Sequence, residues 1–277
     1  MFDQVMQGII QKAEEAENAS RHESAYIDTD GMLHCGVCHG PRQMELDVPL
    51  IGRRIVPIMC QCDQERRERE EAARRAQEEM ERIRQMRNAG ITSADYQRMT
   101  FAADDGCDPR MAALAARYVA KRDEIQAENI GLLLHGNTGG GKTFWAAAIA
   151  NAMIDHACSA MVTTVPQLVT AMAQDFERDK PAILNKLANV RFLVLDDIGF
   201  ERQTQYAAEK LFEIVDARYR ARRPLIVTTN LTMEEIKNPP QMEYKRVFDR
   251  IVEMCQPVHV SGEGRRMAIA RDILGLE

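Results

Sequence analysis

The stretch that decides the fold reads Gly136-Asn137-Thr138-Gly139-Gly140-Gly141-Lys142-Thr143, and it matches G-x-x-x-x-G-K-[ST] at every fixed position. Glycines let a backbone turn its N–H groups inward as a concave anion site. A helix that begins directly after Gly141 adds the positive end of its dipole. A lysine at this position reaches the β- and γ-phosphates of a nucleotide, and the threonine hydroxyl ligates Mg²⁺. We therefore predict a nucleotide-phosphate site at residues 136–143, extended by Phe144.

The segments around this loop predict an α/β fold. Gly131–Gly136 reads as a buried strand and Lys142–His156 as a helix, which is the context that the loop requires. Further strands are expected at 160–165, 190–197, 224–230 and 257–262, and helices at about 109–127, 166–175, 205–222 and 243–253. Unbroken apolar strands that alternate with helices indicate a P-loop parallel sheet covered by helices on both faces.

Two strand ends carry polar side chains that suit a phosphate site. Four apolar residues place Asp196 at the carboxyl end of FLVLD, where it can hold Mg²⁺ through water. Asp197 follows and can orient or deprotonate an attacking water. Asn230 ends PLIVTTN, so its amide can reach the γ-phosphate or that water, although Asn is also a common turn residue. With Lys142, these residues predict a site that hydrolyses ATP.

The order LLLHGNTGGGKT, LVLDDIG, IVTTN and KRVFDRI resembles the AAA+ family, and within it the DnaC/DnaI helicase loaders and the IstB transposition helpers. The resemblance runs from about Asp95 to the C-terminus. It implies that Asp197 occupies the catalytic acidic position, where many AAA+ proteins have Glu, and that hydrolysis is slow. It also implies that Asn230 is sensor 1. The stretch after Asn230 is shorter than the helical lid and helix-turn-helix domain of DnaA-type initiators, so we expect no sequence-specific origin binder.

The resemblance implies roles for several further residues. KRVFDRI resembles the segment that carries an arginine finger, which acts on a neighbour's γ-phosphate. Arg250 is the first candidate, and Arg246, one turn earlier, is the second. GEGRR resembles the sensor 2 region, so Arg266, or Arg265 beside it, would touch the phosphates of its own ATP. Two aromatic residues, Phe176 and Tyr206, fall where the family contacts single-stranded DNA. Their alternative role is packing near the insert 169–187.

Four cysteines form two tight pairs, Cys35-x-x-Cys38 and Cys60-x-Cys62. Four thiolates are a usual structural zinc site, although one residue between the members of a pair is less common. His34 and His39 flank the first pair and can replace a thiolate. Few apolar residues lie between the pairs, so metal binding would supply the folding energy. Four unligated thiols in a loosely ordered segment are the alternative. An N-terminal zinc module is similar to the one with which Gram-positive-type loaders bind the helicase. The resemblance therefore implies that this module binds the helicase.

Two segments flank the cysteine module. Phe2, Val5, Met6, Ile9, Ile10 and Ala13 follow helical spacing, and this apolar face either packs on the module or docks on a partner. Residues 63–88 are mostly charged residues and alanine, with four Glu-to-Arg pairs at i, i+4. Such a helix is typical of a solvated spacer. Its glutamates cancel most of the positive electrostatic field of its arginines, which disfavours a role in binding nucleic acid. The pairs are Glu65/Arg69, Glu70/Arg74, Glu71/Arg75 and Glu78/Arg82. We expect parts at 1–62, 63–90 and 91–277.

Composition limits where the protein acts. A formal net charge of −6 over 277 residues gives no long-range attraction to DNA phosphates, so DNA contact needs a local patch or an assembly. Seven cysteines are an odd number, and they argue against a disulfide framework. No secretory signal is evident, and no apolar stretch approaches the roughly 20 residues that span a bilayer. We expect a cytoplasmic protein.

The expected function is an ATP-controlled adaptor with ATP, Mg²⁺ and Zn²⁺ as cofactors. Residues 2–62 would grip a hexameric replicative helicase, and ATP-bound cores would self-associate and deliver the helicase onto single-stranded DNA. One alternative is a transposition helper, and another is a zinc-dependent DNA-binding module with a structural ATP site. A metabolic P-loop kinase is disfavoured because no acceptor-binding or lid segment is evident.

Overall fold

The structure is a computed structural model, and it describes residues 25–29, 31–48, 52–174, 180–199 and 205–261. The chain forms two compact units that divide between Glu78 and Glu79. The amphipathic segment predicted at Phe2 to Ala13 lies outside the described residues, as do Phe176, Arg265 and Arg266. No described helix combines the length and apolar character that a membrane span requires.

The described part of the first unit consists of two antiparallel hairpins and the start of a long helix. β1 (Tyr26–Ile27) pairs with β2 (Leu33–His34), and β3 (Gln43–Val48) pairs with β4 (Gly52–Pro57). The buried residues in its described part are Cys35, Cys60 and Asp63. The thiols therefore stand where a larger domain has an apolar core, as the sparse apolar residues of this stretch predict.

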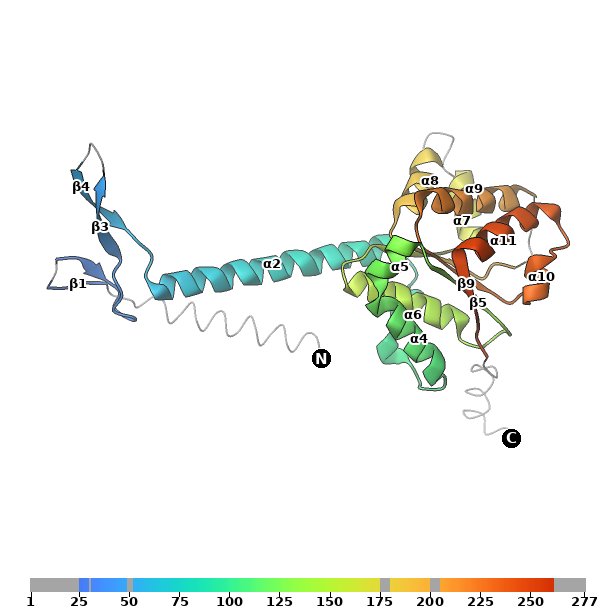
Figure 1. Cartoon of the computed structure of the whole chain (residues 1–277), viewed down its shortest axis with the longest axis horizontal. Helices are drawn as coiled ribbons and strands as arrows, with labels where there is room; N and C mark the ends of the chain where they lie inside the picture. Colours follow the sequence, from blue (N-terminus) through green and yellow to red (C-terminus); the bar gives the residue numbers. More distant parts are fainter. Residues whose placement is uncertain (1–24, 30, 49–51, 175–179, 200–204, 262–277) are drawn as a thin grey trace. The chain divides into compact units, whose positions relative to one another are not determined.

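The long helix α2 (Gln61–Gly90) covers the charged stretch that the sequence predicts as helical (Figure 1). Two of the expected ion pairs form, Glu65–Arg69 at 3.4 Å and Glu71–Arg75 at 3.6 Å between N and O atoms. Two others are wrong, because Arg74 pairs with Glu78 and Arg82 with Glu79. These side chains are largely exposed, and Arg74 and Arg82 each have acidic neighbours both three and four residues away, so the choice between partners is nearly neutral in energy.

The second unit is built on a five-stranded sheet in which every neighbouring pair is parallel. The strand order is β6-β7-β8-β5-β9. The strands are β5 (Gly131–His135), β6 (Ala160–Thr164), β7 (Phe192–Asp196), β8 (Leu225–Thr229) and β9 (Cys255–His259). The predicted parallel α/β sheet is confirmed. Each strand boundary lies within two residues of its expected position, except the end of β9, which comes three residues earlier.

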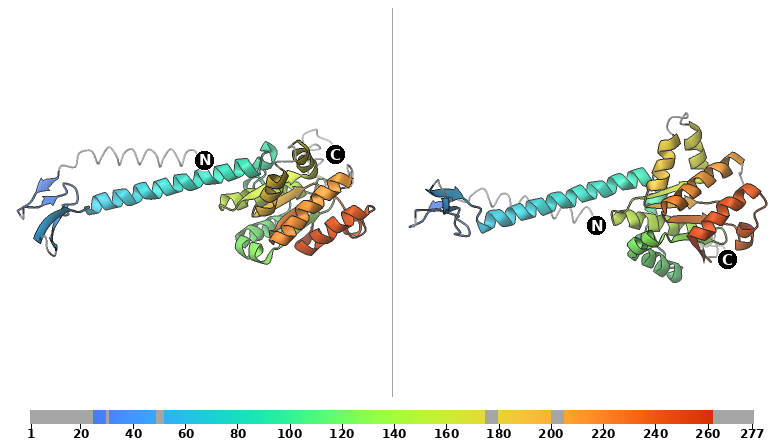
Figure 2. Two further views of the ribbon diagram at one scale, coloured as in Figure 1. Left: turned by 90° about the horizontal axis from the view of Figure 1, so that it is seen from above. Right: turned by 45° about the horizontal axis from the view of Figure 1, so that its top comes forward.

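Helices cover both faces of this sheet (Figure 2). Two hydrophobic clusters result, because alternate residues of a strand point to opposite faces: Leu132 and Leu134 join one cluster, and Leu133 joins the other. The first cluster includes residues of α4 (Pro109–Ala120) and α6 (Lys142–Asp155), and the second includes residues of α9 (Gln205–Ala221) and α11 (Met242–Met254). The helices are α3 (Ala94–Arg98), the 3₁₀ turn η1 (Phe101–Ala103), α4 (Pro109–Ala120), α5 (Arg122–Glu128), α6 (Lys142–Asp155), α7 (Val165–Gln174), α8 (Lys180–Asn189), α9 (Gln205–Ala221), α10 (Met233–Lys237) and α11 (Met242–Met254).

The helix predicted at 109–127 is two helices, which is a correction. Lys121 separates α4 from α5 with φ −95° and ψ 20°. Asn129 then ends α5 in the left-handed conformation, which Asn tolerates better than most residues. This turn leads the chain directly into β5.

A buried arginine joins the sheet to two of its connecting segments. Arg218 of α9 is 0% exposed. Its guanidinium donates to the carbonyl of Leu187 at 3.0 Å and to the carbonyls of Val190 and Pro224. Burial lowers the pKa of Arg218 to about 9. Because the donors satisfy carbonyls at the end of α8 and just before β8, this side chain fixes where both elements lie.

Replacing Arg218 with Met should destabilise the second unit, because the change leaves several buried carbonyls without a donor. We expect a loss of about 3 kcal/mol in the free energy of unfolding, measured by urea denaturation. Arg220→Met is the matched control, since that side chain is 74% exposed on the same helix. The control should change stability by less than about 0.5 kcal/mol. Equal losses in the two variants would contradict this role.

Candidate nucleotide and metal sites

The glycine-rich loop between β5 and α6 adopts conformations that favour glycine. Gly136, Gly139 and Gly141 have φ values of 139°, 85° and 90°. Gly136 has a second constraint, because a Cβ atom there would lie 2.5 Å from the carbonyl oxygen of Val260. The residue directly after the edge strand β9 (Cys255–His259) therefore lies too close to the loop for any side chain at this position.

Lys142 begins α6 and lies folded against its own loop. Its ammonium donates to the carbonyls of Gly136 at 2.8 Å and Asn137 at 2.7 Å. Burial lowers the pKa of Lys142, and the charges of Asp197 and Asp196 oppose that effect. The loop thus holds a positive charge beside two carboxylates, which is the arrangement that a phosphate site with Mg²⁺ requires.

The other members of the loop differ in exposure. Asn137 and Thr138 are exposed, whereas Gly140 is buried. The half-buried ring of Phe144 packs on the first hydrophobic cluster, with its centroid 5.2 Å from that of Trp145. The side chain of Phe144 therefore belongs to the core, and its backbone is the part that continues the loop.

The carboxylate of Asp196 collects hydroxyl groups from three separate segments. Thr143 donates to Oδ1 at 2.9 Å, and Thr228 donates to the same oxygen at 2.6 Å. Tyr96 donates to Oδ2 at 2.9 Å. β8 lies between β5 and β7 in the sheet, so Thr228 fills the space between the loop strand and the strand of Asp196. The sequence reasoning paired Asp196 with Thr143 and missed Thr228 and Tyr96.

Asp197 and Asn230, the two residues predicted to handle the attacking water, lie side by side. The Asn230 amide donates to Asp197 Oδ1 at 3.3 Å. Asp197 is exposed and has a φ of 56°, and its backbone N–H donates to the Thr228 hydroxyl at 2.8 Å. A positive φ is uncommon outside glycine, so the bond to Thr228 supports an unusual conformation that turns this carboxylate out of the sheet.

The two candidate arginine fingers have different surroundings on α11. The Arg250 guanidinium lies 4.1 Å from the ring centroid of Tyr219 and pairs with Glu253 at 3.2 Å and Asp216 at 3.7 Å. Arg246 is exposed, and no described residue pairs with it. Arg250 is therefore held in a defined direction, whereas Arg246 is not.

Tyr206, the described member of the two candidate DNA contacts, lies near the start of α9. Its side chain is 41% exposed, and the Lys210 ammonium lies 5.5 Å from the ring centroid. Lys210 itself is only 7% exposed, and its ammonium pairs with Glu213, so the exposed part of this pair is the tyrosine ring.

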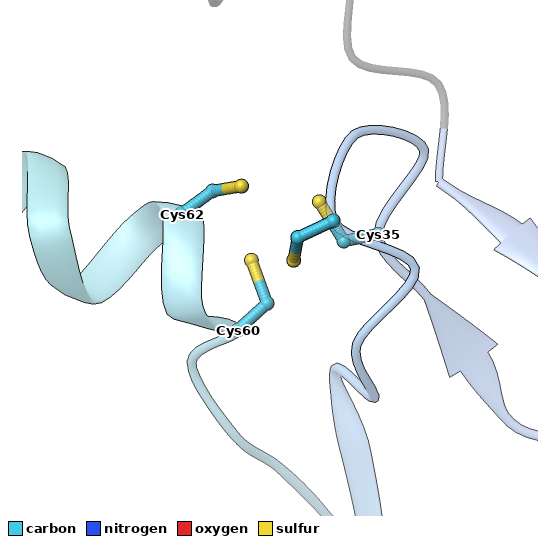
Figure 3. A group of neighbouring side chains, drawn as sticks. Cys35, Cys60 and Cys62 are labelled. Carbon is cyan, nitrogen blue, oxygen red and sulfur yellow. The ribbon is translucent and has the colours of Figure 1, made fainter.

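The four paired cysteines meet in the first unit (Figure 3). Cys35 and Cys38 belong to the turn after β2, and Cys60 and Cys62 lie at the start of α2. The sulfur atoms all lie within 4.8 Å of one another. Zinc–sulfur bonds of about 2.3 Å place tetrahedral thiolates at comparable separations. The residues present therefore fit a zinc ion.

The histidines beside the first pair bond elsewhere. Nδ1 of His34 lies 3.1 Å from the carbonyl oxygen of His39, and Nδ1 of His39 lies 3.1 Å from the hydroxyl of Tyr26. Neither histidine joins the four-thiol group found among the described residues. The geometry thus favours four cysteines over a set in which histidine replaces one.

Crowding of the thiols opposes their ionisation together. Backbone N–H groups of Cys62 and Gly40 lower the pKa of Cys38 to about 6. Burial raises the pKa of Cys60 to about 11, and the bond with Cys38 raises that of Cys62 to about 12. A divalent cation reverses this opposition, because a coordinated thiol is held deprotonated. The Cys60 thiol also donates to Asp63 at 3.4 Å.

A parallel sheet with this strand order, a complete G-x-x-x-x-G-K-[ST] loop and an acidic strand end beside it define a P-loop ATP-binding protein of the AAA+ class. The chain belongs to the family of IstB-like ATP binding proteins, which it matches over residues 63–272.

Curated relatives include both loaders and an insertion-sequence protein. The chain is 33% identical over 150 residues to the replicative helicase loader DnaC of Escherichia coli K12, covering 52% of this chain and 59% of that protein. It is 27% identical over 180 residues to the replicative helicase loader DnaI of Bacillus subtilis, and the match covers 60% of this chain and 58% of that protein. A putative insertion sequence ATP-binding protein of Sinorhizobium fredii is 30% identical over 141 residues, and the match covers 50% of this chain and 44% of that protein. The chain thus matches less than two thirds of the length of each.

Solved structures show the same fold. The crystal structure of DnaI aligns with a TM-score of 0.53 at 24% identity, and it covers 62% of this chain and 96% of its own. The crystal structure of the DnaC helicase loader aligns with a TM-score of 0.55 at 21% identity, and it covers 61% of this chain and 100% of its own.

Metal analysis of the purified chain should find about one zinc ion per molecule, because four thiolates complete one tetrahedral site. Cys35→Ser should lose that zinc, since it removes a buried ligand. Cys107→Ser is the matched control, because Cys107 is exposed and lies outside the group. Equal zinc content in both variants would refute the site.

Proposed function

We propose that this protein is an ATP-hydrolysing loader that binds a replicative DNA helicase and delivers it onto single-stranded DNA. The observation that carries the proposal is the group formed by Lys142, Thr143 and Asp196 at the end of a parallel sheet. Family membership supports ATP binding, and similarity to DnaC and DnaI supports the loader role.

The residues of the site divide the chemistry among them. Lys142 exchanges its two loop carbonyls for the β- and γ-phosphates, and the loop N–H groups bind the same anion. Mg²⁺, when bound, neutralises charge on those phosphates, and Thr143 and Asp196 are the residues that would hold it. Asp197 accepts a proton from the attacking water, and the Asn230 amide beside it orients that water. An Asp at this position supports slow hydrolysis that serves as a switch.

Self-association completes the site in this proposal. Arg250 of one molecule acts on the γ-phosphate held by its neighbour, where a fixed positive charge stabilises the transition state. Its contacts with Tyr219 and Glu253 support this choice over Arg246, because a pre-oriented guanidinium loses less entropy on docking. Arg266, outside the described residues, is proposed as the contact to the molecule's own ATP.

The remaining parts have binding roles in the proposal. Residues 1–62 hold zinc and grip the helicase, residues 63–90 are a spacer, and residues 91–277 bind ATP. Tyr206 and Phe176 stack on bases of single-stranded DNA. The charged spacer supports this division, because its side chains are mostly exposed and satisfied by neighbouring ion pairs.

A second candidate function is regulation of a transposase. The similarity to an insertion-sequence ATP-binding protein favours it. Both functions use the same ATP site, so the partner distinguishes them. The cysteine module favours the helicase as the partner. It precedes the spacer in the sequence and so supplies a binding part that is separate from the ATP site.

Asp197→Asn should separate binding from hydrolysis. The variant keeps the shape and the contact to Asn230 but cannot accept a proton at neutral pH. We expect ATPase turnover to fall at least about a hundredfold while ATP affinity changes less than about threefold. Phosphate release and equilibrium ATP titration measure the two quantities. Turnover that stays within about twofold of the original would exclude Asp197 as the base.

Co-purification with a hexameric replicative helicase, with and without ATP, tests the loader role. We expect association that depends on the cysteine module, so Cys35→Ser should abolish it and Cys107→Ser should not. A transposase from the same source is the parallel bait. Capture of the transposase and not of the helicase would replace the loader by the second candidate.

A further inference from the structure

The Tyr96 hydroxyl reaches the carboxylate of Asp196 from a segment that belongs to none of the nucleotide-binding motifs. We propose that Tyr96 is a positioning residue for this carboxylate, and that it couples the affinity for Mg²⁺-nucleotide to the seating of the segment Ala94–Met99. The inference rests on the proposed ATP site and adds a regulatory contact to it.

The contact occupies a defined place on the carboxylate. An ionised carboxyl group has about four lone-pair positions for hydrogen bonds. Two donors, Thr143 and Thr228, take positions on Oδ1, and Tyr96 takes one on Oδ2. One position on Oδ2 is left for a donor such as a metal-bound water. The tyrosine hydroxyl therefore fixes the oxygen that such a water would meet.

The surroundings of Tyr96 strengthen the bond. The tyrosine is half-buried, and the carboxylate that accepts its bond is 4% exposed, so water competes little for this contact. Hydrogen bonds to a charged acceptor contribute roughly 1.5–3 kcal/mol, about twice the value for neutral pairs.

The backbone of the same segment is tied to the helix of the phosphate loop. Asn151 of α6 is 0% exposed, and its amide donates to the carbonyls of Tyr96 at 2.8 Å and Met99 at 2.9 Å. Lys142 and Thr143 begin the same helix. The segment therefore contacts both sides of the candidate magnesium site, the loop helix through its backbone and β7 through its side chain.

The segment is also the direct continuation of α2. The helix ends at Gly90, where a Cβ atom would lie 1.9 Å from the carbonyl oxygen of Ala160 in β6. Ile91, the next residue, is 0% exposed, and its carbonyl accepts from the Gln97 amide at 2.6 Å. The end of α2, the segment and Asp196 thus form one continuous set of contacts within the second unit.

Linkage makes this coupling reciprocal. If seating of the segment orients Asp196 for the metal, then binding of Mg²⁺-nucleotide must favour the seated segment by the same free energy. Displacement of the end of α2 from its place against β6 would therefore weaken the binding of Mg²⁺-ATP. Simple packing of the Tyr96 ring against the first hydrophobic cluster predicts no such link.

Tyr96→Phe tests the proposal, because it removes the hydroxyl and keeps the ring. Affinity for a fluorescent, slowly hydrolysed ATP analogue is titrated with Mg²⁺ and with EDTA. We expect the Mg²⁺-dependent gain in affinity to fall roughly tenfold, with affinity in EDTA unchanged. Tyr118→Phe is the matched control, since it loses a tyrosine hydroxyl bond to the carbonyl of Ile130 at 2.7 Å, which lies just before β5, at the end of that strand away from the loop.

Hydrogen exchange supplies a second readout that needs no variant. Amides of residues 94–99 in the original chain should gain protection when Mg²⁺ and the analogue are added, and should gain less in Tyr96→Phe. An unchanged Mg²⁺-dependent gain in Tyr96→Phe, or no added protection in the original chain, would overturn the coupling. An original chain that binds the analogue under neither condition would refute the ATP site itself.

Discussion

A buried carboxylate that accepts three hydroxyl groups organises the second unit. Asp196 is 4% exposed, and a buried carboxylate is costly unless donors replace its water. The donors come from the start of α6, from β8 and from the segment before η1. Their bonds therefore require the loop helix, the middle of the sheet and the entry of the chain to take up one arrangement together.

The strand order gives each donor its place. β8 separates β5 from β7, so the loop and the acidic strand end cannot bond directly through their backbones. Thr228 joins them by donating to Asp196 while accepting from the backbone N–H of Asp197. The same threonine thus holds the carboxylate that we propose for magnesium and sets the direction of the next one, which Asn230 contacts.

The first unit is stabilised on a different principle. Its described part buries two thiols and a carboxylate where the second unit buries two clusters of apolar side chains. Arg42 and Arg66 both pair with Asp63, which accepts from the Cys60 thiol. A set of charges around a thiol group suits a metal site, in which binding and folding are one reaction.

The sequence predicted the elements whose signals are local. The sheet follows from apolar runs such as FLVLD, and the loop follows from its glycines and Lys142. Tyr96 and Thr228 could not be found this way, because Tyr96 lies 100 residues from its partner and Thr228 reads as an ordinary strand residue. The hairpins of the first unit were missed since their exposed strands lack the alternation of a half-buried sheet. The choice of ion pairs along α2 failed because near-equal alternatives compete.

The central claim is that Asp196 holds the magnesium ion of a bound nucleotide. Isothermal titration of ATP in the presence of Mg²⁺, with the original chain and with Asp196→Asn, tests it most directly. Asn keeps the size of the side chain and removes the charge, so the account predicts that the variant binds ATP at least about tenfold more weakly with Mg²⁺ and equally well in EDTA. Equal affinity of the two proteins for Mg²⁺-ATP would contradict the account.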